Sequence, residues 1–394
     1  MKKITARYCM PLKWVFPFLI IVCIVSSSIA QTDIPEFQKR FVPLFDAGVN
    51  ISLLEHYWST ADVILQAGNG KNLTTAYKLG FKTVRLPMDF TLFLKNDKVT
   101  FTEEVKKKIS LAFDYINVHH MTMILSFHEF GESASNRITN ERIMADAEKG
   151  IKIWAQIINL FKGKGYNNLY FELYDEPRAK FDETWEMVNK MAMARLRPLD
   201  RQRYWIVGTN RYMSVRGFQG LNPIPGDDKV LYSFHFYNPY IFTHQGAPWD
   251  KTNTYLTGLP YPYAANEMPP ITEKARNDKD MSYNYQHYSE KANKAYIHQM
   301  FMMAHEWSMR NNVPIICTET GTIATIPDKY RNNFIRDVAD VLKSYGIPMV
   351  VWEMDQSFKI TDKNGNLLSA ITDWINSYKE PKSTELKIKP FGVN

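Results

Sequence analysis

Residues 168–177 read NLYFELYDEP, an apolar and aromatic run that ends in two acidic residues and a proline. Such a run is typical of a strand in a parallel sheet that is covered by helices, and its polar end marks the point where the strand reaches the surface. Seven other short runs have the same character. The eight predicted strands are residues 45–51, 82–86, 121–127, 168–173, 203–208, 229–234, 313–318 and 347–352.

Amphipathic stretches alternate with these runs. Gly163 and Gly346 follow two of the stretches and are predicted to stop the helices. Eight strands that alternate with helices over about 330 residues predict an α/β fold, a single-domain (β/α)8 TIM barrel. A doubly wound open sheet is the alternative, but it usually carries a Gly-rich phosphate-binding turn, and the sequence contains neither GxGxxG nor GxxxxGK. The predicted helices include Glu103–Val118, Asp146–Phe161, Asp182–Leu196, Lys291–Arg310 and Asp328–Tyr345.

The composition is that of an ordinary globular protein, with 45% hydrophobic and 23% charged residues, which excludes a disordered chain. The formal net charge is +7, but four of the 48 basic residues and none of the 41 acidic ones lie in the first thirty positions. The rest of the chain is only slightly basic, which argues against nucleic acid as a partner. Residues 31–378 are predicted to form the barrel and residues 379–394 a polar tail, in a protein expected to be a monomer.

The first thirty residues have the three parts of a secretory signal peptide. A cationic start is followed by an apolar run from Val15 to Val25 and by small residues at Ser28 and Ala30. Cleavage is predicted after Ala30, which places the mature protein in the periplasm or outside the cell. The apolar run is shorter than the roughly 20 residues that span a bilayer, so no stable membrane span is expected after cleavage. An uncleaved anchor and a lipid attached at Cys23 are the alternatives.

Six of the predicted strands end in ionisable or aromatic residues. In a (β/α)8 barrel the carboxyl ends of all strands meet at one mouth, where burial and neighbouring charges shift pKa values. Glu176 and Glu319 would face each other across this mouth. Glycoside hydrolysis uses such a pair: one carboxylic acid protonates the leaving oxygen, and one carboxylate attacks the anomeric carbon. The candidate residues at the strand ends are Arg85, His128, Asp175, Glu176, His235, Tyr237, Glu319 and Trp352.

These residues, in this order along the chain, resemble the pattern of glycoside hydrolase family 5, the cellulase-type branch of the retaining (β/α)8 hydrolases. The resemblance extends from Gly48 to Trp352, and six of its motifs fall in register on the eight predicted strands. It implies that Glu176 is the general acid/base and that Glu319 is the nucleophile that forms a glycosyl-enzyme intermediate.

The resemblance also implies roles for the neighbours of the two carboxylates. Arg85 would lie beside Glu319 and keep it ionised, since an adjacent cation lowers the pKa of a carboxylate. Tyr237 would present its hydroxyl to the same carboxylate, His235 would line the pocket near the acid/base, and His128 would hydrogen-bond sugar hydroxyls. For each of them a purely structural role is the alternative.

Asp175 departs from the family pattern, which has Asn before the acid/base. The resemblance implies that the amide of this Asn donates to the sugar 2-hydroxyl, whereas an ionised Asp can only accept. Bonds of this kind supply several kcal/mol in the transition state. We therefore expect low turnover on ordinary β-glucosides or a preference for a sugar with a different 2-position, and we expect Asp175→Asn to change the activity.

The longest predicted connection lies between the sixth and seventh strands, and its residues 238–290 are rich in aromatic side chains. Long connections in compact domains are often functional, and aromatic faces stack well on pyranose rings. The segment is predicted to form a wall of the substrate cleft, with Trp249 as a binding residue, and the resemblance implies that Trp352 stacks on the bound sugar. Ordinary packing of the loop onto the barrel is the alternative.

The sequence thus predicts a secreted retaining glycoside hydrolase that acts on a β-linked polysaccharide or oligosaccharide. An endo-β-1,4-glucanase, or cellulase, is preferred over a mannanase, xyloglucanase or β-1,3-glucanase. A glycan-binding barrel with little or no hydrolytic activity is the alternative, because of Asp175. An acyl hydrolase is disfavoured because no GxSxG motif is present. No cofactor and no metal ion are expected, since the histidines lack the HExxH register and the cysteines form no cluster.

Overall fold

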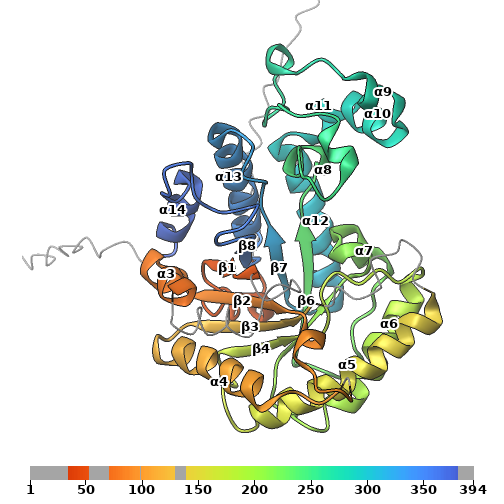
Figure 1. Ribbon diagram of the computed structural model, residues 1–394, viewed down its shortest axis with the longest axis vertical. Coiled ribbons are helices and arrows are strands. Elements are labelled where there is room, and N and C mark those ends of the chain that lie inside the picture. The colour runs from red at the N-terminus through yellow and green to blue at the C-terminus, as the bar shows by residue number, and fades with distance from the viewer. Residues whose placement is uncertain (1–33, 53–70, 98, 129–138, 380–394) are drawn as a thin grey trace, which may run out of the picture. The chain divides into compact units, whose positions relative to one another are not determined.

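The computed structural model describes residues 34–52, 71–97, 99–128 and 139–379, so the predicted signal peptide and almost all of the predicted tail lie outside the described residues. Eight parallel strands pair in chain order, and β8 closes the barrel against β1 (Figure 1). The predicted (β/α)8 barrel is confirmed. The strands are β1 (Gly48–Asn50), β2 (Thr83–Met88), β3 (Thr122–Phe127), β4 (Leu169–Glu172), β5 (Trp205–Gly208), β6 (Val230–Phe236), β7 (Ile315–Thr320) and β8 (Met349–Val351).

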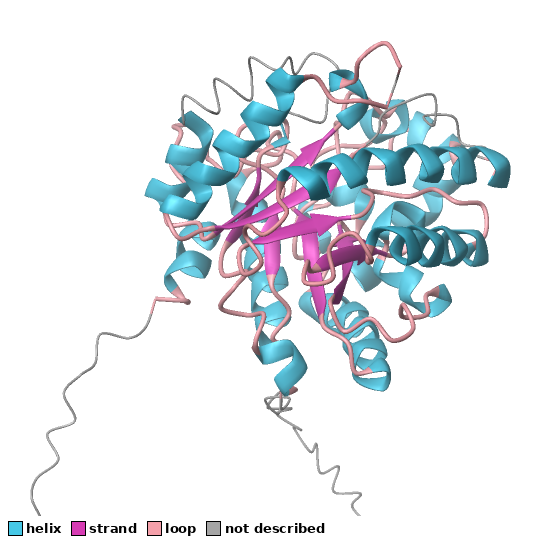
Figure 2. Cartoon of the chain, turned by 90° about the horizontal axis from the view of Figure 1, so that it is seen from below, coloured by secondary structure: helices cyan, strands magenta, loops and turns pink. Residues whose placement is uncertain are grey.

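Helices surround the strands (Figure 2). The first of the long ones, α4, begins after Thr102, whose hydroxyl accepts the amide of Val105. Its bounds and those of α6 are as predicted, whereas α5 begins earlier than predicted, at Asn140, because the hydroxyl of Thr139 caps it there. Among the described residues, the helices outside the β6–β7 connection are α1 (Glu36–Lys39), α3 (Lys71–Leu79), η2 (Phe90–Phe93), α4 (Glu103–Val118), α5 (Asn140–Leu160), α6 (Asp182–Leu196), α7 (Asn210–Met213), η4 (Val215–Gly220), α13 (Asp328–Ser344) and α14 (Ser369–Asn376).

The segment before β1 fills the amino end of the barrel. Phe41 and Phe45 are buried and pack against side chains from the strands, namely Ile124, Tyr170, Ile206, Leu231, Ile316 and Val350. The amide of Gln38 anchors this segment, because its nitrogen donates to the carbonyls of Ile315 and Gly346 at 2.9 Å each. The first predicted strand was therefore too long, since Phe45 belongs to this segment, which fills the amino end of the barrel. A filled amino end leaves the carboxyl end of the strands as the place for a site.

The connection from β6 to β7 contains several short helices, followed by one long helix close to the predicted Lys291–Arg310. Some of its aromatic side chains are structural: Tyr261 is buried and donates to Asp337 at 3.0 Å, and Tyr288 is buried and donates to the carbonyl of Pro260 at 2.7 Å. Others, including Tyr240 and Trp249, are exposed. The helices are α8 (Tyr240–Thr243), η5 (Lys251–Thr254), η6 (Ala265–Glu267), α9 (Glu273–Asn277), α10 (Lys279–Gln286), α11 (Tyr288–Lys291) and α12 (Lys294–Asn311).

Candidate active site

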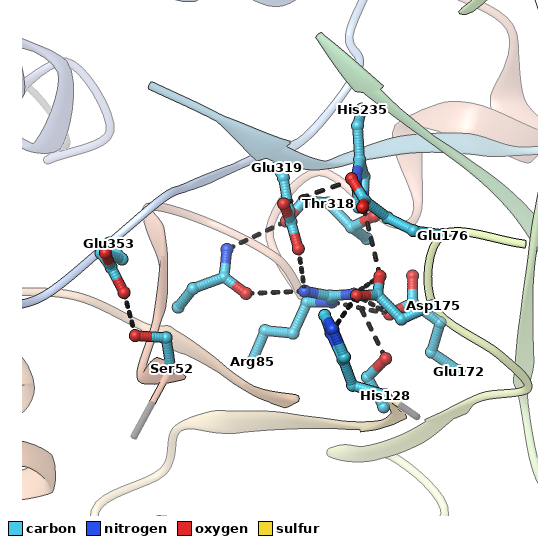
Figure 3. Close-up of polar contacts among 12 residues, drawn as sticks. Ser52, Arg85, His128, Glu172, Asp175, Glu176, His235, Thr318, Glu319 and Glu353 are labelled. Carbon is cyan, nitrogen blue, oxygen red and sulfur yellow. Dashed lines mark hydrogen bonds and ion pairs between the residues drawn. The ribbon is translucent and has the colours of Figure 1, made fainter. Parts of the chain in front are cut away.

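Arg85 on β2 is the centre of a buried polar cluster at the carboxyl end of the barrel (Figure 3). Its guanidinium contacts three carboxylates: Glu319 through Nη1 at 2.7 Å, Glu172 through Nε at 2.6 Å, and Asp175 through Nη2. Burial by itself would lower the pKa of Arg85, but Asp175, Glu172 and Glu319 outweigh burial and raise it well above the ordinary value. The cluster therefore holds a permanent cation between the carboxylates.

Removing this cation is expected to destabilise the fold. In Arg85→Met three buried carboxylates would lose their shared partner, and removing one partner from a buried ion pair typically costs about 3–5 kcal/mol. Urea unfolding at neutral pH measures the loss. The variant should recover part of this stability as the pH falls, because the unpaired carboxylates can then take up protons. An unfolding free energy equal to that of the wild type would contradict the assignment of Arg85 as their common counter-ion.

Glu319 lies near the end of β7, and each of its carboxylate oxygens accepts a hydrogen bond from a neighbouring side chain. Oε1 accepts from Arg85, and Oε2 accepts from the Tyr237 hydroxyl at 2.9 Å, with His235 Nδ1 3.4 Å away. Burial, followed by the charges of Glu319 and Glu176, raises the pKa of Tyr237 well above its ordinary value. The phenol of Tyr237 therefore stays protonated and can donate this hydrogen bond. The carboxylate of Glu319 is thus held in one orientation by neighbours that favour its charged form.

A bulge in the sheet places Glu319 opposite His235. The register of β6 against β7 pairs Phe234 with Cys317 and then His235 with Glu319, so Thr318 is the extra residue. Bulges of this kind bend a strand and redirect a side chain, and they are frequent beside active sites. The sequence contains no signal for this bulge.

Glu176 follows β4 in a left-handed backbone conformation, with φ at 44°. This conformation costs a non-glycine residue on the order of 1–2 kcal/mol. The neighbouring backbone holds it, because the amide of Asp175 donates to the carbonyl of Phe127 at 2.8 Å, and the amide of Tyr212 donates to the carbonyl of Pro177 at 3.1 Å. The side chain of Glu176 is 35% exposed, in contrast to the nearly buried Glu319.

His235 joins the two predicted catalytic residues. Its Nδ1 lies 3.2 Å from Oε1 of Glu176 and 3.4 Å from Oε2 of Glu319. The two carboxylate oxygens can therefore be no further apart than these two distances laid end to end. The structure brings the two acids together at the mouth of the barrel, one partly open to solvent and the other held against a cation (Figure 3).

Asp175 is completely buried beneath this pair. One oxygen contacts Arg85, the other contacts Nδ1 of His128, and Nε2 of His235 lies 3.6 Å away. Burial would raise the pKa of Asp175, but Arg85 and then His128 outweigh it and hold the pKa well below the usual range. Asp175 is therefore ionised, and its two carboxylate oxygens contact Arg85 and His128.

Glu172 is a member of the cluster that sequence reasoning missed. It lies on β4, is fully buried, and accepts from Arg85 and from the hydroxyl of Ser233 at 3.2 Å. A charged residue inside an otherwise apolar strand was the available signal, since a buried charge requires a partner.

The two predicted tryptophans lie outside the polar cluster. Trp352 follows β8 and is half-buried against the core. Its carbonyl oxygen would lie 2.1 Å from a Cβ at position 321, which is why only glycine fits there. Trp249 is exposed, and its ring lies 6.1 Å from that of Phe358, which in turn contacts the ring of Tyr237 at 5.8 Å. Sugar contacts for both tryptophans stay a prediction.

His244, at the end of α8, is buried beside Tyr237 and makes the stability of the fold depend on pH. Its ring stacks on Tyr240 with centroids 4.0 Å apart, and burial lowers its pKa to about 3 from the ordinary 6.5. Below about pH 6.5 His244 therefore binds a proton in the unfolded chain but stays neutral in the folded protein. Stability is expected to fall by about 1.4 kcal/mol per pH unit from this residue as the pH drops from about 6.5 towards 3. Unfolding experiments on wild type and His244→Asn should show a shallower acid dependence in the variant, and parallel curves would contradict this.

Asp175, His235 and Glu319 also offer three potential metal-ligand atoms within 4.8 Å of one another. Both carboxylates of this group, however, already face the guanidinium of Arg85. The expectation that the protein needs no metal ion stays a prediction. In the part of the chain that the structure describes, no helix is long and apolar enough to cross a membrane.

A (β/α)8 barrel with two acids facing each other at its carboxyl end is the arrangement of a glycoside hydrolase. Comparison with known families agrees: the family model for cellulase, glycosyl hydrolase family 5, matches residues 46–358. The chain belongs to glycosyl hydrolase family 5, and it is a glycoside hydrolase.

Two endoglucanases share about a quarter of the aligned residues with this chain. Endoglucanase C of Acetivibrio thermocellus is 26% identical over 291 residues, which cover 72% of this chain and 82% of that protein. Endoglucanase 3 of Fibrobacter succinogenes is 23% identical over 315 residues, which cover 74% of this chain but less than half, 46%, of that protein. Among solved structures, Thermotoga maritima Cel5A in complex with mannotriose superimposes with a TM-score of 0.68 at 17% identity over 86% of this chain and all of that one. This last likeness supports the fold alone.

Proposed function

We propose that the protein is a secreted, retaining endo-β-1,4-glucanase in which Glu176 is the acid/base and Glu319 is the nucleophile. In the first step Glu319 would attack the anomeric carbon while Glu176 protonates the departing oxygen, and a glycosyl ester on Glu319 would form. In the second step Glu176, now a carboxylate, would take a proton from water as the water attacks the same carbon and releases Glu319. Two inversions at one carbon retain the configuration.

The shared contact of both acids with His235 carries this proposal. Because one ring nitrogen lies 3.2 Å from an oxygen of Glu176 and 3.4 Å from an oxygen of Glu319, these two oxygens lie no further apart than the sum of the two distances, which accommodates the separation of a retaining enzyme. Inverting enzymes hold their acids roughly 6.5 to 9.5 Å apart to make room for water, and retaining enzymes about 5 to 5.5 Å. The unequal exposure also fits the roles, since the acid/base must reach both the leaving group and water.

Exposed aromatic rings near the acids support a polymeric sugar as the substrate. Tyr212 is about half exposed, and its backbone is bonded to the residue after Glu176. Tyr240 and Trp249, from the β6–β7 connection, are similarly exposed. Flat apolar faces of this kind suit the faces of pyranose rings. The names of the relatives, endoglucanases, favour a glucan over a mannan or xyloglucan.

A product profile tests the proposal. Purified protein would be incubated with soluble β-1,4-glucan, mixed-linkage glucan, β-1,3-glucan, mannan and xyloglucan, with Glu319→Gln as the control. The proposal expects reducing ends from β-1,4-glucan, a rapid fall of viscosity that indicates internal cleavage, and no release by the variant. Release of reducing ends from mannan or xyloglucan alone would show that this polysaccharide, and not β-1,4-glucan, is the substrate. Binding of glycan without release by either the wild type or the variant would favour the non-hydrolytic barrel.

Secretion and the oligomeric state have tests of their own. Expression with the natural leader should yield a protein outside the cytoplasm whose first residue is Gln31, by N-terminal sequencing. Light scattering of that material should give the mass of a monomer. A protein that keeps its first thirty residues would contradict the proposed cleavage after Ala30.

A further inference from the structure

Asp175 lies in the polar cluster of the site but takes no part in the proposed mechanism. Its side chain has no exposed surface, and a ligand cannot touch a carboxylate without such surface. The direct sugar contact expected from the sequence is therefore unavailable in this conformation. Any effect of Asp175 on the substrate must pass through the groups that it contacts, which are Arg85, His128 and, at 3.6 Å, His235.

The positions of hydrogen atoms around Asp175 follow from the partners. Arg85 can only donate, so the oxygen of Asp175 that faces it must accept. The second oxygen faces Nδ1 of His128 and is also an acceptor only, because Arg85 and His128 keep this carboxyl ionised. A hydrogen must therefore sit on Nδ1 of His128, whether the ring is neutral or protonated. The same oxygen could not form this bond with a ring that carries its hydrogen on Nε2 alone.

An asparagine in the same place would reverse this arrangement. Its amide NH2 group cannot face the donating guanidinium of Arg85, so its oxygen would take that side and its nitrogen would face His128. The amide nitrogen donates, and Nδ1 of His128 would have to accept. The neutral ring would then carry its hydrogen on Nε2. The difference between Asp and Asn at position 175 thus decides which nitrogen of His128 is the donor.

His128 is placed to transmit this difference to the cleft. It follows β3, and its backbone amide is fixed by the carbonyl of Met88 at 2.8 Å. Nδ1 is buried, whereas about a tenth of the side chain is exposed, so the exposed surface belongs to other atoms of the residue. We propose that Asp175 is a positioning residue that holds His128 in the form with a hydrogen on Nδ1, and so sets the hydrogen-bonding role of Nε2 towards the bound sugar.

This inference rests on the proposed function only for its last step, the hydrogen bond between Nε2 of His128 and the bound sugar. The hydrogen position itself can be measured without any substrate, by nitrogen NMR of protein labelled with 15N-histidine at about pH 8, above the ordinary histidine pKa of about 6.5. The His128→Gln variant identifies the signals of this ring by their loss. We expect a hydrogen on Nδ1 in the wild type and a neutral ring with its hydrogen on Nε2 in Asp175→Asn. The same form of the ring in both proteins would overturn the proposal.

Glu172→Gln is the matched control. It also removes one carboxylate charge that faces the guanidinium of Arg85. Glu172, however, is bonded to Arg85 and Ser233 and not to His128. The ring of His128 should keep its Nδ1 hydrogen in this variant. A change of the ring as large as in Asp175→Asn would show that the charge of the cluster, and not the direct contact, sets its form, and would overturn the assignment to Asp175.

A double-mutant cycle tests the step to the sugar. With an intact His128, Asp175→Asn is expected to lower kcat/KM on β-1,4-glucan by roughly tenfold to a hundredfold, the effect of one hydrogen bond to a charged group. In a His128→Ala background the same substitution should have little further effect, because its route to the substrate is gone. Equal losses in both backgrounds would mean that Asp175 acts on the sugar directly. If neither protein hydrolyses any glycan while the NMR result holds, the proposed function fails and the role of Asp175 towards His128 stands.

Discussion

Glu319→Gln is expected to lower the rate of glycan hydrolysis by roughly 10⁴-fold to 10⁶-fold, the range seen when the nucleophile of a covalent mechanism is removed. The amide cannot form the glycosyl ester, and it places a neutral group where Arg85 and Tyr237 now stabilise a carboxylate. The steady-state rate of reducing-sugar release measures the loss. Substrate binding should survive, since the substitution preserves the shape of the side chain.

Glu306→Gln is the control for this prediction. Glu306 is exposed on α12 and pairs with Arg310 of the same helix at 3.8 Å, outside the predicted cleft wall, so the variant removes one carboxylate without touching the site. Its activity should equal that of the wild type. A Glu319→Gln enzyme that retains more than about a hundredth of the wild-type rate would show that another group forms the covalent bond or that none forms, since general acid–base help alone typically contributes 10²–10⁴-fold.

Glu176→Gln is expected to have the second-largest effect, and one that depends on the leaving group. On polysaccharide, whose leaving oxygen needs a proton, kcat/KM should fall by roughly 10²-fold to 10⁴-fold. On an aryl β-glycoside with an acidic phenol, the first step needs no proton donor, so kcat/KM should fall far less. Loss of the base should then slow the second step and lead to accumulation of the glycosyl-enzyme, visible as a burst of phenol.

Comparison of the two substrates distinguishes an acid/base from a residue that only shapes the pocket. A structural role for Glu176 would lower kcat/KM on both substrates by the same factor and give no burst. Glu183→Gln, which changes an exposed carboxylate near the start of α6, controls for the loss of charge near this loop. Added azide should speed the second step in Glu176→Gln, because this anion needs no general base.

The barrel could be predicted from the sequence because each strand is an apolar run and each helix has strong local signals. The bounds of α4 and α6 were correct, since an acidic first turn marks the start of each. The predicted start of α5 was wrong, because Ile143 is the one buried side chain of the helix before Asp146, where the prediction began. Phe45 was assigned to a strand although it fills the barrel, because burial in a plug and in a sheet leave the same apolar composition.

The location of the candidate residues could also be predicted, because the polar ends of parallel strands meet at one mouth, whereas their catalytic roles stay a prediction. The connections between them could not. The bulge at Thr318, the contact of His235 with both acids and the burial of Asp175 depend on backbone geometry across several strands. Glu172 was missed for a related reason: its role depends on contact with Arg85, which lies two strands away in the sheet.

The identity of the covalent intermediate tests the central claim most directly. A 2-deoxy-2-fluoro β-glucoside or cellobioside with a good leaving group slows both steps but lets the first outrun the second, so the glycosyl-enzyme accumulates. Peptide mass spectrometry of the inactivated protein should find one sugar on the peptide that contains Glu319, and none in Glu319→Gln. A sugar on another residue, or steady hydrolysis with no labelled peptide, would contradict the mechanism in which Glu319 attacks and Glu176 supplies the proton.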